Sequence, residues 1–278
     1  MATLSLRRSL HLIFAFGWSD FVLKYRGSFF GYLWSLAAPL MRFLVIYYVF
    51  HRFVAREIPH YPLYLFLGII LWEHFTLTTT ACMTMLYEKA SLIKKVPFPR
   101  ILLILVTGWT HILIFVTHFV IFLAGAMLLH VSLWMALWYL PLLMLQMTLL
   151  ALGIGMILSA YSLKFRDIQH LWLVLSQLLF WLTPIMYSYR ADAPVWQAFK
   201  VTLQGAFTPS LIGLFDVFVR FQPLSILIHD ARRVFLYSAT WQIPSGTHMM
   251  VFTGLCALLF LLGAIIFQRR SRYFLQEY

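Results

Sequence analysis

Residues 101–129 read ILLILVTGWTHILIFVTHFVIFLAGAMLL, and this stretch contains no Asp, Glu, Lys or Arg. A helix needs about 20 apolar residues to cross the hydrocarbon core of a bilayer, which is about 30 Å thick. Three other long stretches also lack these four residue types, and two more each contain a single charge, Arg42 or Glu73. Because lipid offers the backbone no hydrogen-bond partner, we expect helices rather than open strands. The six predicted spans are residues 31–50, 61–87, 101–129, 134–163, 168–189 and 247–268.

The composition excludes several classes of protein. Of 278 residues, 62% are hydrophobic and 11% are charged, whereas a soluble domain has about 45–50% apolar and about 25% charged residues. The net charge of +12 is typical of some nucleic-acid binders, but such proteins lack long uncharged aromatic runs, so we predict no nucleic-acid partner. Cys82 and Cys256 both lie in apolar stretches. Two such cysteines make neither a disulfide scaffold nor a zinc site, and we predict no bound metal.

The basic residues predict how the chain crosses the membrane. With six spans both termini lie on the same side, and most of the 21 Lys and Arg residues fall in the loops and termini of that side. Because Lys and Arg accumulate in cytoplasmic loops, both termini are predicted to be cytoplasmic. The whole chain, residues 1–278, is then predicted to be one multi-pass membrane domain.

Two segments outside the spans have their own predicted structure. Residues 4–28 combine apolar positions at helical spacing with basic residues, which predicts an amphipathic helix on the cytoplasmic membrane surface. A flexible basic tail is the alternative. Residues 190–246 contain four prolines and apolar pieces that are too short to cross. We expect short re-entrant or interfacial helices on the outer side, because such pieces are too apolar for a soluble loop.

The known catalytic patterns are missing from the sequence. There is no G-x-x-x-x-G-K-[ST], since none of the 13 glycines is followed by lysine, and the chain therefore has no P-loop to hold ATP phosphates. The patterns G-x-S-x-G, H-E-x-x-H and C-x-x-C are missing too. We predict no catalytic residue and no cofactor on this chain. Any use of ATP and Mg²⁺ requires a separate ATPase subunit.

Arg42 and Glu73 are the two charges within predicted spans. Such charges are costly and usually face a partner or a water-filled cavity. Counting 1.5 Å per helical residue from the two ends of the membrane places them at similar depths. The hypothesis is that they form an ion pair. The pair either simply joins two helices or lies beside an aqueous path, and the sequence favours neither.

Aromatic residues are dense in the first and fifth predicted spans. Tyr and Trp accumulate at membrane interfaces, which explains many of them. The alternative is a path lined by aromatic rings, because such rings stack on the apolar faces of sugars while their O–H and N–H groups meet hydroxyls. The candidate path residues are Tyr32, Trp34, Arg42, Tyr47, Tyr48, Glu73, Trp172, Phe180, Trp181 and Tyr187.

The first cytoplasmic loop, residues 88–100, reads EKASLIKKVPFPR. It is short and basic, and its two prolines limit it to one compact helix. The loop is either a solvated connection or a docking element for a cytoplasmic partner. Docking is favoured because a solvated loop would not need the apolar Leu92, Ile93 and Val96. The candidate docking residues are Glu88, Ser91, Leu92, Ile93, Lys94, Lys95, Val96 and Arg100.

Several short motifs, in order along the chain, resemble the permease subunits of ABC-2 type exporters for cell-surface polysaccharides, the O-antigen and capsule exporters. The match begins near residue 20 and continues to the end of the chain. The motifs are KYRGS at 24–28, GYLWS at 31–35 with Pro39, YPL at 61–63 with Leu67, Gly68 and Trp72, LIKKV at 92–96 with Pro99 and Arg100, KFRDI at 164–168, TPIMY at 183–187, and PLS at 223–225 with Arg232.

The resemblance implies a homodimer of six-span subunits that pairs with two cytoplasmic P-loop ATPase subunits, which bind ATP and Mg²⁺. Residues 88–100 would be the coupling helix, and a channel at the dimer interface would carry a lipid-linked polysaccharide. The N-terminal helix, with Lys24, Tyr25 and Arg26, would contact membrane lipids and admit the lipid anchor. Pro223, Asp230 and Arg232 would belong to an outer gate. The chain departs from the family pattern at Arg42, Glu73-His74, Gln222 and His229.

Two other functions stay open from the sequence. An ABC-2 type permease for another lipid or small molecule would have the same architecture, and only the resemblance argues against it. A membrane-embedded glycosyltransferase or acyltransferase would need clustered catalytic carboxylates or a histidine at a span end. The nine acidic residues are dispersed along the chain, which disfavours an enzyme.

Overall fold

The computed structural model describes residues 6–27, 31, 33–54, 58–89, 99–131, 133–187, 218–219, 221–237 and 243–271. Within these residues every regular element is a helix, so the predicted all-helical fold class is confirmed. Five helices are long and apolar enough to cross a membrane: α2 (Leu33–Val54), α3 (Tyr61–Glu88), α5 (Arg100–Leu128), α6 (Leu140–Ser162, extended by the 3-10 helix η1, Trp134–Tyr139) and α11 (Gly246–Ser271). The shorter helices are α1 (Leu6–Tyr25), α7 (Asp167–Leu182) and α10 (Pro223–Phe235).

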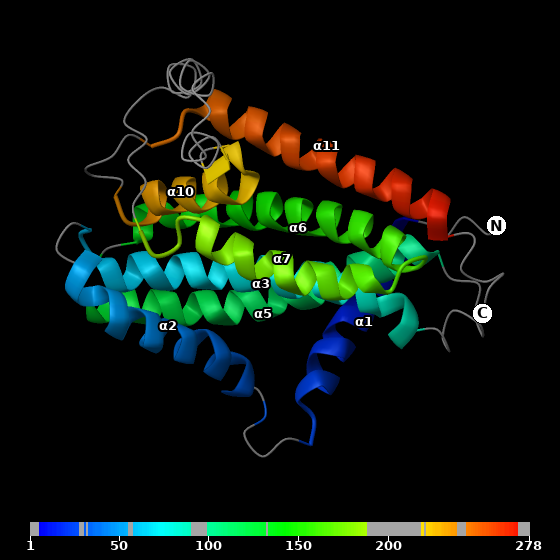
Figure 1. The fold of residues 1–278 in the computed structure, drawn as a ribbon, viewed down its shortest axis with the longest axis horizontal. Coiled ribbons are helices and arrows are strands. Elements are labelled where there is room, and N and C mark those ends of the chain that lie inside the picture. Colours follow the sequence, from blue (N-terminus) through cyan, green and yellow to red (C-terminus); the bar gives the residue numbers. More distant parts are fainter. Residues whose placement is uncertain are drawn as a thin grey trace.

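Helix α3 is the centre of the bundle. It packs against α2, α5, α6, α7 and α10, and most of its residues are buried. A helix that is apolar on all sides lies in a protein core or spans a membrane, and most of α3 is covered by neighbouring helices. Figure 1 shows α3, α5 and α6 side by side, with α7 across them and α11 along one edge. Five helices are therefore arranged around α3, while α1 packs on α5 and α11 packs mainly on α6.

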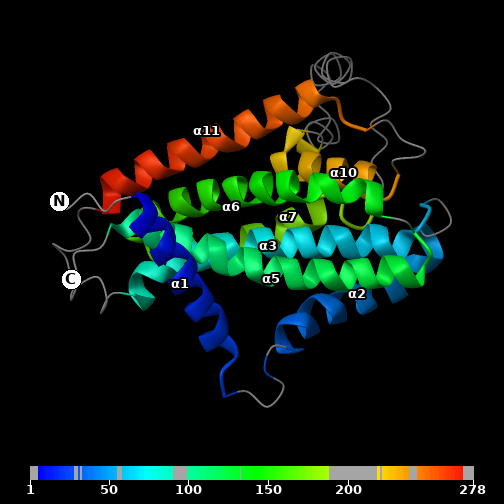
Figure 2. The same cartoon turned by 180° about the vertical axis from the view of Figure 1, so that it is seen from behind.

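The two ends of the bundle differ. Helix α1 begins and α11 ends at one end, which we call the termini end, and Lys89 and Arg100 also lie there (Figures 1 and 2). The opposite end, which we call the α10 end, contains α10 and the turn that follows α7. Which end faces the cytoplasm stays a prediction.

Helix α7 ends seven residues before the predicted end of the fifth span at residue 189. The helix stops at Leu182, and Thr183 is extended, with φ −77° and ψ 135°. The cause is Pro184, because proline disfavours helical geometry in the residue before it and has no N–H of its own. With 16 residues α7 is shorter than the about 20 that a span needs. Six spans therefore remain a prediction.

The N-terminal segment forms the predicted helix, which packs across α5. The contact is close at Gly17, where a Cβ atom would stand 2.6 Å from Trp109 Cδ1. The Thr110 hydroxyl donates a hydrogen bond of 3.2 Å to the Gly17 carbonyl, and Phe14 meets the Trp109 ring edge-on. Beyond these contacts, the end of α1 points away from the long helices (Figure 2). The position of α1 on a membrane surface stays a prediction.

Helices α6 and α11 approach each other closely at two glycines. A Cβ on Gly153 would lie 2.9 Å from the backbone of Leu259, and a Cβ on Gly263 would collide with the Gly153 carbonyl oxygen. Small residues at a crossing allow two backbones to approach closely, and the resulting packing is a main source of helix association in membranes.

Replacing Gly263 by Ala should lower the free energy of unfolding by about 1–3 kcal/mol, because the added methyl group meets backbone that cannot move aside. The matched control is Gly254→Ala on the same helix, where nothing lies within 4 Å of the new Cβ. Thermal unfolding of the detergent-solubilised protein measures the difference. Equal melting temperatures for the two variants would contradict the close crossing.

Candidate translocation site

The predicted ion pair between Arg42 and Glu73 is confirmed. Arg42 Nη1 of α2 donates to Glu73 Oε1 of α3 at 2.5 Å. The Glu73 side chain is only 8% exposed, while that of Arg42 is 42% exposed. The guanidinium also lies 5.7 Å from the centre of the Phe180 ring of α7. Arg42 thus connects three helices, and its exposed part faces away from the core of the chain.

A cleft of about 290 Å³ lies beside this pair, between α2 and the long helices. Glu73 lines the cleft together with Trp34 and Ala38 of α2, and Lys24 from the last turn of α1 lines it too. His118 Nε2 lies 3.0 Å from the Ser35 carbonyl oxygen, and a hydrogen bond there requires the ring nitrogen to carry the proton. The cleft therefore offers an ammonium group, an aromatic residue and a carboxylate to an amphiphilic molecule.

Two of the eight candidate aromatic residues are buried anchors. Trp172 Nε1 donates to Thr79 Oγ1 at 3.2 Å, and the Trp172 ring meets Phe75. Phe180 meets Trp72 with ring centres 5.6 Å apart. Both attach α7 to α3 and are covered within this chain.

The other candidate aromatics are more accessible. Trp34, Tyr48 and Trp181 are exposed, Tyr48 at 80%. Tyr47 is half-buried and stacks on Phe43. Tyr187 is half-buried as well, and Tyr32 lies outside the described residues. Among the described candidates, Trp34, Tyr48 and Trp181 therefore present most of their surface to whatever covers α2 and α7.

Arg232 is the central side chain of the α10 end. It is 1% exposed, and its guanidinium donates to the carbonyl oxygens of Pro184 at 2.6 Å, Ile185 at 2.8 Å and Tyr64 at 3.1 Å. It also lies 3.4 Å from the centre of the Tyr64 ring. Gly68 makes the approach possible, since a Cβ there would stand 2.6 Å from Arg232 Nη2. Arg232 therefore supplies donors to the carbonyls that the end of α7 leaves free.

The other predicted gate residues also belong to α10. Pro223 is its first residue, where a missing N–H costs nothing. Asp230 Oδ2 lies 2.8 Å from His248 Nε2, which joins α10 to α11. Gln222 donates to Thr183 Oγ1 and to Ser225 Oγ. Burial lowers the pKa of His229 to about 4, so this side chain is neutral near pH 7.

The sequence missed the contacts that Tyr61 and Tyr64 make. Their hydroxyls donate to the carbonyl oxygens of Met186 and Tyr187, at 3.1 Å and 2.9 Å. The proline after Thr183 is the one signal that free carbonyls would need donors here. Nothing in the sequence shows which side chains reach them.

The predicted docking segment is described only at its two ends. Glu88 ends α3 and Arg100 begins α5, and both lie at the termini end. Ser91, Leu92, Ile93, Lys94, Lys95 and Val96 lie outside the described residues. In the N-terminal segment, Lys24 lines the cleft, Tyr25 ends α1 and Arg26 is exposed.

The family model described as ABC-2 type transporter matches residues 11–203. The chain belongs to this family. Two proteins named O-antigen export system permease protein RfbA, from Klebsiella pneumoniae, are 31% and 30% identical over 173 residues, which is 61% of this chain and 66% of each relative. A protein of the same name from Myxococcus xanthus is 24% identical over 255 residues, covering 91% of this chain and 90% of the relative. The family match begins within α1, includes α2 to α7 and ends before α10.

Removing Arg42 should destabilise this transporter more than removing the whole ion pair. Arg42→Met leaves a buried carboxylate without its partner, which costs about 1–3 kcal/mol after allowance for the exposure of Arg42. Arg42→Met/Glu73→Met removes both charges and should recover most of that loss. Thermal unfolding of the four members of the cycle gives the coupling, and Arg52→Met, an exposed residue of α2, is the control. Strictly additive effects would show that the pair has no such role.

Arg232 should not be replaceable by lysine. A single ammonium group on a flexible stem cannot reach three carbonyls and the Tyr64 ring together, so Arg232→Lys should lower the free energy of unfolding by about 2 kcal/mol. Arg233→Lys is the matched control, since the next residue of α10 makes none of these bonds. If both lysine variants melt at the same temperature, the bonds of Arg232 do not stabilise the α10 end.

Proposed function

We propose that this chain is the permease subunit of an ATP-driven exporter that moves a lipid-linked cell-surface polysaccharide of the O-antigen type across the bacterial inner membrane. The observation that carries the proposal is the alignment with a protein named O-antigen export system permease over 91% of this chain. Two further relatives carry the same name, although the chain spans only 66% of their length. A capsule-type glycan has the same chemical character and is a close variant of this cargo.

The energy comes from a separate ATPase. The sequence has no P-loop, so ATP and Mg²⁺ bind to a cytoplasmic partner of which two copies serve two permease chains. Residues 88–100 are the docking element, because this loop combines basic residues with apolar ones. The positive-inside rule places this loop and both termini in the cytoplasm.

The channel forms between two copies of the chain. Few residues of α2 are fully buried within one chain, and α7 also presents apolar side chains along most of its length. A second copy would cover part of these faces. Trp34, Tyr48 and Trp181 would then face the space between subunits, where rings and hydroxyls suit sugar surfaces.

The cleft beside α2 receives the lipid-linked end of the glycan. Lys24 supplies a positive charge near its opening, which favours a phosphate group, and Trp34 and Glu73 offer a ring and a hydrogen-bond acceptor to a sugar. The α1 helix lies beside this cleft and contacts membrane lipids. This assignment agrees with the amphipathic character predicted for residues 4–28.

The test is ATP-dependent uptake of glycan by inverted membrane vesicles. Vesicles that contain this chain and its partner ATPase should protect a lipid-linked polysaccharide from an added glycosidase when ATP is present. Lys94→Glu/Lys95→Glu, which reverses the charge of the docking loop, should release the ATPase and abolish protection.

The control is the same vesicle with a P-loop lysine variant of the ATPase, which should protect no glycan. Failure of the wild-type vesicles to protect glycan would overturn the proposal. Uptake of a lipid without attached glycan, in the same vesicles, would favour a permease for another cargo.

A further inference from the structure

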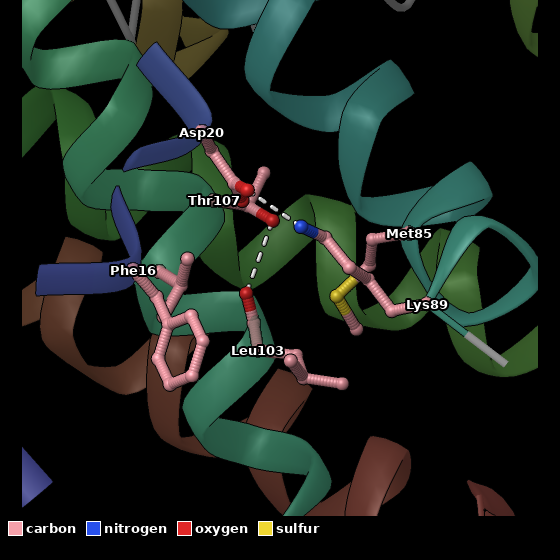
Figure 3. A pocket seen from close by; sticks show the side chains of 7 residues that line it. Phe16, Asp20, Met85, Lys89, Leu103 and Thr107 are labelled. Atoms are coloured by element: carbon pink, nitrogen blue, oxygen red, sulfur yellow. Dashed lines mark hydrogen bonds and ion pairs between the residues drawn. The ribbon is translucent and has the colours of Figure 1, made fainter. Parts of the chain in front are cut away.

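An ion pair joins α1 to the end of α3 at the termini end of the bundle. Lys89 Nζ lies 2.6 Å from Asp20 Oδ1 (Figure 3). Both side chains are partly exposed, and partly exposed pairs usually add little to stability. The pair is therefore of interest for the helices that it joins rather than for its contribution to stability.

The pair lies in a close-packed junction of three helices. Phe16 of α1, Met85 of α3 and Leu103 of α5 surround it, and the cavity between them is about 20 Å³, roughly the size of one water molecule. The hydrogen bond from Thr110 to Gly17 fixes α1 on α5 about one helical turn away. Since little free space remains, α3, α5 and α1 cannot shift here independently of one another.

The junction lies beside both ends of the segment that would bind the ATPase. Lys89 directly follows α3, and Arg100 begins α5. Thus α1 contacts the ends of both α3 and α5, the two helices that residues 90–99 connect. A displacement of that segment by a cytoplasmic partner would act on Lys89 and Arg100 at its two ends, and through Lys89 on Asp20.

Helix α1 also leads from this junction to the cleft beside α2. Lys24 is four residues after Asp20 in the same helix, which is about 6 Å along its axis. Lys24 lines the cleft that also contains Trp34 and Glu73. A helix transmits a displacement along its length, so a movement of Asp20 moves Lys24 with it.

We infer that the Asp20–Lys89 pair couples the ATPase docking segment to α1 and, through Lys24, to the cleft. Asp20 and Lys89 are positioning residues that touch no cargo. This inference rests on the proposed function, because it assumes that residues 88–100 receive the movement of an ATPase. It adds that the cleft changes with the state of that ATPase.

Charge reversal tests the connection in the complete transporter, with permease and ATPase together in vesicles. Asp20→Lys places two ammonium groups at the junction, and Lys89→Asp places two carboxylates there. Each should lower the glycan transported per ATP hydrolysed about tenfold. The exchange Asp20→Lys/Lys89→Asp restores opposite charges and should return this ratio to within about threefold of the wild type. Arg7→Asp, an exposed residue of α1, is the matched control and should leave the ratio unchanged.

The ratio separates coupling from stability. A merely structural pair would lower the amount of assembled transporter and leave the transport per ATP as it was, and that result would overturn the inference. So would single reversals that export normally, or an exchange that restores nothing. If a reversed variant does not assemble, Asp20→Asn and Lys89→Gln remove the attraction without repulsion and should lower the ratio less. Wild-type vesicles that export no glycan contradict the proposed function instead.

Discussion

A backbone group buried away from water must find its hydrogen-bond partner in the protein, and this constraint governs the α10 end of the bundle. Helices meet it by themselves, but α7 stops at Leu182 and leaves carbonyls at Pro184 and Ile185 without helical partners. A buried guanidinium from α10 supplies the donors. Burying the charged Arg232 would be costly by itself, and so would leaving the carbonyls after α7 without hydrogen bonds. Both costs fall because the guanidinium donates to these carbonyls. Neither feature would be stable alone.

The same constraint makes the two ends of the bundle unequal. At the α10 end, Arg232 and two tyrosine hydroxyls attach the turn after α7 to α3, and Asp230 connects α10 to α11. At the termini end, α1 rests on α5 through small contacts and on Lys89 through one ion pair. The close packing of α1, α3 and α5 around this pair, rather than the partly exposed pair itself, holds α1 in place.

The sequence correctly predicted the features that follow from composition and from the cost of burying a charge. Uncharged runs located the long helices, and depth alone paired Arg42 with Glu73. It could not distinguish buried from exposed aromatic residues, because periodicity shows which residues share a face but not what covers that face. Trp172 and Phe180 became buried anchors, while Trp181, the residue after Phe180, stays exposed. The role of Gly68 was hidden for a related reason, since its partner, Arg232, is distant in sequence.

The described charges within the bundle are mostly neutralised locally. Arg42 pairs with Glu73, Asp230 with His248, and Arg232 with backbone carbonyls and a tyrosine ring. A long polymer can slide past a surface only if no single site holds it strongly, because binding must be weak enough to allow release. Under the proposed function, the Arg42–Glu73 pair meets this need if it lines the path, because it leaves Arg42 partly exposed without a net charge that would hold an anionic chain in place.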